Sequence, residues 1–345
     1  MTSNQNKQEK KVAWVFPGQG SQYVGMGKEL RDSYRVAQEV FEQANEAMGF
    51  DLAKVCFEGP EEKLRLTAYT QPAILTVSIA ALKVLRDQIP QVKPIAVAGH
   101  SLGEYTALVS AGAIEFQDAV RIVHKRGQFM QEAVPNGVGA MAAILGMERL
   151  KLQEICEQVA AKGQVVAPAN LNSPEQIVIA GHTEAVAEVT ELAKQAGAKK
   201  VIPLSVSAPF HCSLMQPAAS RLAEELDKIT FRDLEIPLVT NVDGTFIRTA
   251  REVKPTLLRQ VTAPVCWEDD IHQILKIGWS QKTTSSSGSG EDLNRSEDST
   301  PLIFVEIGPG KVLSGLIRRI DKNAITLNVE DLKSLEKTVQ ALSGN

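Results

Sequence analysis

The stretch "AVAGHSLGEYTALVSAG", residues 96–112, places a serine at an abrupt change in the chain pattern. Ser101 stands between Gly99 and Gly103, after an apolar run and before a helical pattern that ends at Gly112. This arrangement is typical of a nucleophile elbow, in which a serine hydroxyl is presented at the edge of a sheet. An ordinary glycine turn is the alternative. The strand-turn-helix context favours the nucleophile.

A nucleophilic serine needs a base, and the chain contains five histidines. His211 lies in an irregular segment directly after a predicted strand, where two domains are expected to meet and a cleft to form. His100 neighbours the serine and is expected to point the other way. We therefore predict that His211 is the base. The other three histidines fit helical or turn positions, namely His124, His182 and His272. Spacing leaves the third member of a triad open among Asp243, Asp269 and Asp270.

Strand and helix patterns alternate around the elbow. Residues 11–18 and 94–99 are short apolar runs typical of buried parallel strands. Residues 71–89 and 116–134 carry apolar side chains at helical spacing, and Pro72 fits the first position of its helix. This order predicts an α/β fold with a largely parallel sheet.

Residues 137–205 change to the order strand-helix-strand-strand-helix-strand, with a turn at 172–174. That order predicts a small ferredoxin-like α+β domain. We place it at 136–206, inserted into a large catalytic domain formed by 11–135 and 207–345.

One segment stands apart in composition. "SQKTTSSSGSGEDLNRSEDST", residues 280–300, is rich in Ser, Gly and acidic residues and contains a single apolar side chain, Leu293. Such a segment cannot bury enough apolar surface to offset its ordering entropy. We expect a disordered loop at 281–299.

Composition and charge exclude several classes of protein. The formal net charge is −4 and no long basic block occurs, so we expect no nucleic-acid partner. No uninterrupted apolar run approaches the ~20 residues of a membrane span, and the polar N-terminal stretch predicts no secretory signal. The four cysteines form no C-x-x-C pair, as expected in a reducing cytoplasm. We expect a soluble cytoplasmic protein without a metal site.

Several motifs, in this order, resemble the malonyl-CoA:acyl-carrier-protein transacylases of fatty-acid synthesis. The resemblance runs from about residue 12 to residue 335. Acyltransferase domains of polyketide synthases resemble the same family. It implies an α/β-hydrolase-like large domain and a ferredoxin-like small one. The motifs are "FPGQGSQ" (16–22), "GHSLGEY" (99–105), "RGQFMQEA" (126–133), "GAMAAILG" (139–146), "APFHC" (208–212), "NVDG" (241–244) and "VEIGPGKVLSGL" (305–316).

The resemblance also implies roles for individual residues. Ser101 would accept the acyl group and His211 would be its base, with a glutamine oxygen at Gln260 in place of the usual carboxylate. Backbone N–H groups of Gln19 and Leu102 would form the oxyanion hole. Substrate binding would fall to Arg126, which would hold the malonyl carboxylate, together with Gln19 and His100.

The implied reaction moves malonyl from malonyl-CoA to the phosphopantetheine thiol of acyl carrier protein through a malonyl-serine, with no cofactor. We expect a monomer. Phe210, in place of the serine in "YASH", resembles malonyl-selective members. The alternatives are a polyketide-type acyltransferase of different acyl specificity, a serine esterase or thioesterase, and a non-catalytic module that binds a carrier protein.

Overall fold

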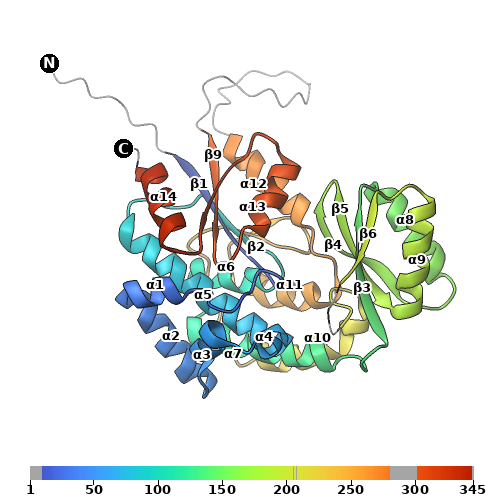
Figure 1. Ribbon diagram of the computed structural model, residues 1–345, viewed down its shortest axis with the longest axis horizontal. Helices are drawn as coiled ribbons and strands as arrows, with labels where there is room; N and C mark the ends of the chain where they lie inside the picture. Colours follow the sequence, from blue (N-terminus) through green and yellow to red (C-terminus); the bar gives the residue numbers. More distant parts are fainter. Residues whose placement is uncertain (1–9, 205, 207, 280–300, 344–345) are drawn as a thin grey trace.

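The chain forms two sheets of different kinds, seen in a computed structural model that describes residues 10–204, 206, 208–279 and 301–343 (Figure 1). One sheet has six strands in the order β10-β9-β1-β2-β7-β8, and the other has four in the order β4-β5-β3-β6. Every pair in the larger sheet is parallel except β7 with β8, whereas the smaller sheet is antiparallel. This confirms the predicted mixed α/β architecture with a largely parallel sheet. The predicted loop at 281–299 lies outside the described residues.

The larger sheet is buried on both faces. Trp14 and Phe16 of β1 pack into one hydrophobic cluster, whereas Ala13 and Val15 pack into another on the opposite face. Side chains alternate along a strand, so a strand that is apolar throughout fits a sheet covered on both sides. The strands are β1 (Lys11–Phe16), β2 (Ala96–Gly99), β7 (Leu238–Val239), β8 (Phe246–Ile247), β9 (Leu302–Ile307) and β10 (Ile325–Val329).

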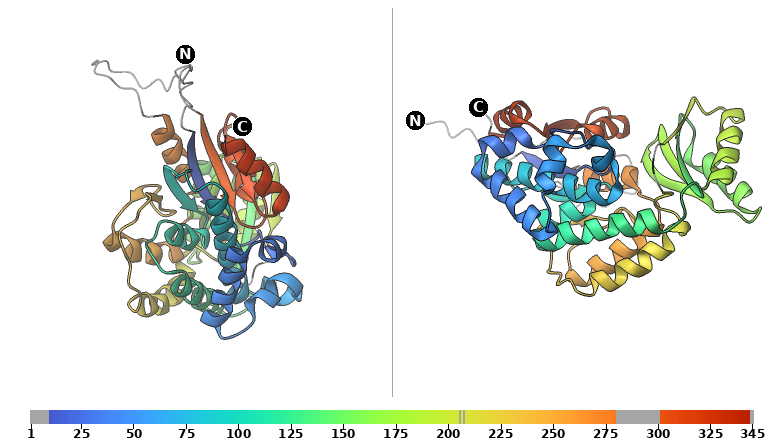
Figure 2. Two further views of the ribbon diagram at one scale, coloured as in Figure 1. Left: turned by 90° about the vertical axis from the view of Figure 1, so that its left-hand side faces the viewer. Right: turned by 60° about the horizontal axis from the view of Figure 1, so that its bottom comes forward.

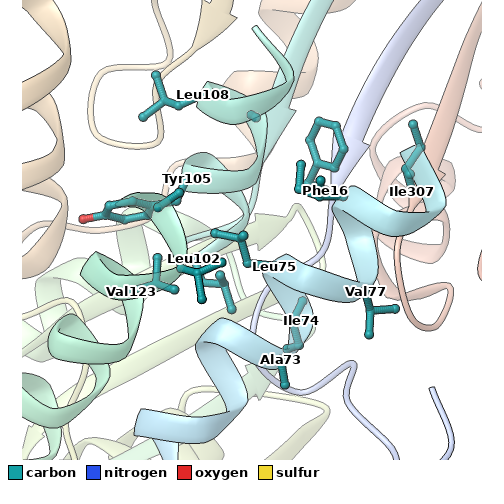
Figure 3. Packing of buried hydrophobic residues seen from close by; sticks show 14 of the residues in the cluster. Phe16, Ala73, Ile74, Leu75, Val77, Leu102, Tyr105, Leu108, Val123 and Ile307 are labelled. Atoms are coloured by element: carbon teal, nitrogen blue, oxygen red, sulfur yellow. The ribbon is translucent and has the colours of Figure 1, made fainter. Parts of the chain in front are cut away.

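Helices supply the cover on each side. Helices α12 and α13 pack on the face of Ala13 and Val15, and α5, α6 and α7 pack on the other. Figure 3 shows Phe16, Leu75 and Leu102 among the side chains of this second face. The helices around the larger sheet are α1 (Lys28–Ser33), α2 (Arg35–Met48), α3 (Leu52–Glu58), α4 (Glu61–Arg65), α5 (Thr67–Gln88), α6 (Gly103–Ser110), α7 (Phe116–Glu132), the 3-10 turn η1 (Ser213–Met215), α10 (Gln216–Leu226), α11 (Ala250–Thr262), α12 (Trp267–Trp279), α13 (Val312–Ile320) and α14 (Leu332–Ser343).

Helix α5 starts five residues before Pro72, so the predicted start at that proline is wrong. Proline has no N–H, and inside a helix it leaves the carbonyl four residues earlier without its usual donor. That carbonyl belongs to Ala68, and it lies 2.7 Å from Nδ1 of His124 on α7. The imidazole replaces the missing helical bond, which lets the helix continue through Pro72. This also explains His124 as a satisfied structural residue.

The smaller sheet shares the main core. Met141 and Ala143 of β3 belong to the large cluster around β1, whereas Ala142 and Ile144 pack against α8 and α9. Figures 1 and 2 show these two helices on the outer face of the sheet, away from the larger unit. The elements are β3 (Gly139–Leu145), α8 (Arg149–Ala160), β4 (Val166–Ser173), β5 (Gln176–His182), α9 (Thr183–Gln195) and β6 (Lys200–Pro203). Strand β4 includes two of the three residues predicted as the turn at 172–174.

Helix α5 is also long and apolar enough to span a membrane by length and composition. In the fold, 89% of its most apolar window is buried inside the protein. The hydrophobicity of the helix is therefore accounted for by its central position in the core.

The two glycines of the elbow should not tolerate a side chain. A Cβ on Gly99 would lie 1.9 Å from the carbonyl of Gly103, and a Cβ on Gly103 would lie 2.2 Å from the carbonyl oxygen of Phe16. Both obstacles are main-chain atoms that cannot move aside. We expect Gly99→Ala to lower the free energy of unfolding by several times the ~1 kcal/mol of an average substitution, as measured by urea denaturation.

Gly315, inside α13, is the matched control, because a Cβ there meets nothing within 4 Å. Gly315→Ala should stabilise the protein by about 0.5–1 kcal/mol through helix propensity and lower chain entropy. Equal effects at the two positions would contradict close approach as the reason for the elbow glycines.

Candidate active site

Ser101 occupies a strained turn between β2 and α6. Its φ is 52°, in the left-handed region that residues with a side chain rarely adopt. The turn lies against the loop after β1, since a Cβ on Gly18 would be 2.4 Å from the His100 carbonyl oxygen. The geometry is that of the predicted elbow, with the serine at the carboxyl end of a central strand.

His211 meets this serine from the segment after β6. Its Nε2 lies 2.7 Å from Ser101 Oγ, and its Nδ1 lies 2.8 Å from the main-chain carbonyl oxygen of Gln260. A carbonyl only accepts hydrogen bonds, so the proton sits on Nδ1 and Nε2 is free to take the proton of Oγ. His211 has a φ of 60°, and among the described residues it shares this left-handed backbone only with Ser101 and glycines.

None of the three acids left open by spacing contacts His211. Asp243 pairs with Arg259 at 2.5 Å, and Asp269 pairs with Arg149 at 3.0 Å. Asp270 is buried and accepts a hydrogen bond from Asn241 at 2.8 Å. The oxygen that orients His211 is instead the main-chain oxygen of Gln260, which spacing could not identify because any residue carries one.

Arg126 is buried beside the serine and histidine, with 2% of its surface exposed. Its Nη2 donates to Ser101 Oγ at 3.1 Å and to Oε1 of Gln260 at 2.9 Å, and its Nη1 donates to Oε1 of Gln71 at 2.8 Å. Its Nε has no hydrogen-bond partner. Among the residues that the structure describes, no carboxylate lies within 4.0 Å of this guanidinium, so the cation is buried without an ion pair.

Burial and positive charge keep His211 neutral. Removal from water, followed by the nearby Arg126 charge, lowers its pKa to about 3. Both effects disfavour the imidazolium. The ring is therefore in its basic form throughout the neutral range.

A cavity opens onto these groups at the boundary between the two sheets. His100 is among the residues that line it, and Nε2 of its ring lies 2.8 Å from Oδ1 of Asn172 on β4. The predicted residues Gln19 and Leu102 also line it. The full lining is Gln19, Gln71, His100, Ser101, Leu102, Arg126, Met130, Met141, Asn170, Leu204, Val206, Phe210 and His211.

The remaining histidines lie elsewhere. His182 accepts a hydrogen bond from the main-chain N–H of Val165 at 2.9 Å, and His272 lies on α12, 3.9 Å from Glu268. Within the described part of the chain, no group of three or more His, Cys, Asp and Glu side chains is placed to hold a metal ion.

Three polar side chains under the elbow escaped prediction. Gln71 holds Arg126, while Glu104 and Asn241 lie behind Ser101. Oε2 of Glu104 accepts from the Asn241 main-chain N–H at 3.0 Å and from Nε2 of Gln260 at 2.9 Å. Burial raises the pKa of Glu104 to about 7. For Gln71 and Glu104 the available signal is a polar side chain within an apolar helical run, whereas Asn241 follows a short apolar strand.

Comparison with known families decides what kind of protein carries this site. Residues 13–322 match the model of the acyl transferase domain. The chain belongs to that family. The match confirms the resemblance drawn from the motifs and makes the protein an acyltransferase.

Relatives and solved structures agree with this family. The malonyl CoA-acyl carrier protein transacylase of Bacillus subtilis strain 168 is 44% identical over 332 residues, covering 96% of this chain and 97% of that protein. The Escherichia coli K12 protein of the same name is 47% identical over 308 residues, covering 89% and 92%. The structure of the transacylase of Coxiella burnetii superposes with a TM-score of 0.88 at 41% identity, covering 97% of this chain and 98% of that one.

The lowered pKa of His211 predicts a flat pH profile for the reactivity of Ser101. For an imidazole with an ordinary pKa near 6.5, the neutral fraction would fall about tenfold between pH 8 and pH 5.5. With a pKa of about 3, His211 stays neutral as the pH falls through this range. We expect the rate of modification of Ser101 by an uncharged sulfonyl fluoride, followed by intact-mass spectrometry, to change by less than about twofold.

Glu104→Gln is the control, because it removes a second buried group that titrates in the same range. It should give the same flat profile. A rate that falls with a midpoint near pH 6.5 in both the wild type and Glu104→Gln would show that His211 is not held neutral.

Proposed function

We propose that the protein transfers the malonyl group from malonyl-CoA to the phosphopantetheine thiol of an acyl carrier protein, supplying fatty-acid synthesis. The observation that carries the proposal is a buried, unpaired Arg126 within hydrogen-bonding distance of a serine that is activated by a neutral histidine. The names of the relatives support the same substrate and acceptor. A similar solved structure is described as a malonyl-transacylase in complex with a type II PKS acyl-carrier protein.

In the first half-reaction, Ser101 Oγ attacks the thioester carbonyl as His211 Nε2 takes its proton. The main-chain N–H groups of Gln19 and Leu102 stabilise the negative charge on the carbonyl oxygen. The carbon–sulfur bond then breaks, and His211 returns the proton to the sulfur of CoA. The products are a malonyl ester on Ser101 and free CoA.

The second half-reaction reverses the roles. The carrier-protein thiol attacks the malonyl ester while His211 takes the thiol proton. The ester bond to Ser101 breaks, and His211 protonates Oγ to regenerate the enzyme. Throughout, the Gln260 carbonyl oxygen keeps the imidazole in the tautomer that the transfer requires.

Arg126 selects a substrate that carries a free carboxylate. A guanidinium presents N–H donors in a planar fork that matches the two oxygens of a carboxylate. Because a buried cation without an anionic partner is costly, the free carboxylate of the malonyl group supplies the charge that the protein omits. A serine esterase would not need such a residue, which favours the malonyl transferase over that alternative. A non-catalytic module would not need the paired Ser101 and His211.

Finer features of the fold belong to the same proposal. The larger unit would be α/β-hydrolase-like, and the smaller one, spanning 136–206, ferredoxin-like, supported by the strand order β4-β5-β3-β6. The protein would act as a cytoplasmic monomer without a cofactor, away from nucleic acids and membranes. His100 and Gln19 would contact the substrate, because both line the cavity.

Ser101 should be acylated by malonyl-CoA in a single covalent step. Incubation should add one malonyl mass in intact-mass spectrometry, and Ser101→Ala should lose both the adduct and the transfer. His211→Ala should slow acylation by about 10²–10⁴-fold, as expected for loss of a general base. An adduct that persists in Ser101→Ala would place the acyl group on another residue.

Arg126 should determine the preference for malonyl over acetyl thioesters. Removing one partner of a buried charge pair costs about 2–5 kcal/mol, so Arg126→Ala should lower kcat/KM for malonyl-CoA by about 30- to 5,000-fold. Acetyl-CoA has no carboxylate, and its kcat/KM should change little. Arg126→Lys should recover only part of the loss, because an ammonium lacks the planar fork. Equal losses for both thioesters would make Arg126 a structural residue.

A further inference from the structure

The side chain of Asn241 lies beneath the elbow and binds both ends of its turn. Asn241 follows β7 and is fully buried. Its Oδ1 accepts a hydrogen bond from the main-chain N–H of Ser101 at 2.7 Å, and its Nδ2 donates to the main-chain oxygen of Gly99 at 2.8 Å. One carboxamide therefore connects the residue that ends the strand to the strained residue two positions later.

Asn241 is itself fixed from several directions. Its Nδ2 also donates to Oδ2 of Asp270 at 2.8 Å, and its main-chain N–H donates to Glu104 at 3.0 Å. Its main-chain oxygen accepts from the N–H of Cys266 at 2.7 Å. Rotating the carboxamide by half a turn would place its oxygen against the oxygens of Gly99 and Asp270. It would also place its NH₂ group against the N–H of Ser101. Only one orientation satisfies these groups.

We propose that Asn241, oriented by Asp270, is a positioning residue that holds the Ser101 backbone in its left-handed conformation and so aims Oγ at His211. The proposal rests on the proposed function, in which Ser101 is the acyl acceptor. A left-handed backbone on a residue with a side chain is strained and persists only where the surroundings impose it. Without Asn241, the N–H of Ser101 loses its partner and the turn relaxes.

Asp270 fixes the orientation of the carboxamide. It is fully buried, and its Oδ2 accepts a hydrogen bond from Nδ2 of Asn241 at 2.8 Å. Burial raises the pKa of Asp270 well above its usual value. The contact with Asp270 thus helps to determine which end of the Asn241 side chain carries the NH₂ group.

The test measures acylation and binding separately. In Asn241→Leu, which has a similar volume and no polar atoms, the rate of acylation at saturating malonyl-CoA should fall about 100-fold, the cost of a displacement of about 1 Å. The malonyl-CoA concentration for half-maximal rate should stay within about threefold of wild type, since Arg126 and the cavity are unchanged. Rapid quench followed by intact-mass spectrometry gives both quantities.

Thr338→Val is the matched control. Thr338 on α14 is buried and donates a hydrogen bond to the main-chain oxygen of Asn328 at 2.8 Å, away from the cavity lining. It should lower the melting temperature and leave the acylation rate unchanged. If folded Asn241→Leu also loses only stability and acylates at the wild-type rate, Asn241 is merely structural and the proposal is wrong.

An exchange of the two side chains keeps the test decisive if Asn241→Leu does not fold. Asn241→Asp alone should acylate slowly, because a carboxyl carries at most one proton where the amide supplies two. Adding Asp270→Asn supplies a new NH₂ donor to the carboxyl at 241. The double variant should acylate at least about tenfold faster than Asn241→Asp alone. A double variant no faster than the single one would overturn the proposal.

The same variants also separate this proposal from the proposed function. If malonyl-CoA fails to acylate the wild type, the proposed function falls, and modification by the uncharged sulfonyl fluoride then measures the reactivity of Ser101 across the series. A reactivity of Asn241→Leu equal to that of wild type would overturn the positioning role by itself.

Discussion

Ser101 and His211 face each other at 2.7 Å while both hold backbone conformations that ordinary residues avoid. The rest of the site follows from the need to maintain those two conformations. Gln260 contributes to both, since its main-chain oxygen orients His211 and its Nε2 donates to the main-chain oxygen of Ser101 at 3.0 Å. The supporting groups are buried, where an unmade hydrogen bond costs more than it does in water. Buried polar contacts under the elbow therefore hold the strain that brings nucleophile and base together.

Charge in this buried region is arranged around one cation. Arg126 is in contact with neutral side chains, and its pKa is lowered by burial, while burial raises the pKa of Glu104 to about 7 and also raises that of Asp270. The hydrogen bonds of the guanidinium go to Gln71, Ser101 and Gln260 rather than to either acid. The same positive charge helps to keep His211 unprotonated. A single buried arginine thus helps to keep the base neutral, and in the proposed function the same charge would hold the carboxylate of the substrate.

The fold was predictable from the sequence wherever apolar side chains repeat at the spacing of a strand or a helix. The apolar strand 11–16, the helix at 116–132 and the strand-helix order of 139–203 were found at nearly their observed bounds. The elbow at Ser101 was predictable because Gly99 and Gly103, which make it possible, lie only two residues away in the sequence. Spacing could not show which oxygen faces His211, because that oxygen is a main-chain atom 49 residues away. The start of α5 was missed because it depends on His124, a side chain from a different helix.

The smaller sheet has a mechanical consequence. Two units joined by a polar interface would swing about their connections, and the width of the cleft would vary. Here Met141 and Ala143, with Val178 and Ala180 on the next strand, belong to the same apolar core as β1. Opening the two units would expose that core to water, which opposes widening of the cleft. In the proposed reaction, the flexible pantetheine arm would therefore carry the malonyl group to Ser101 without requiring the two units to move apart.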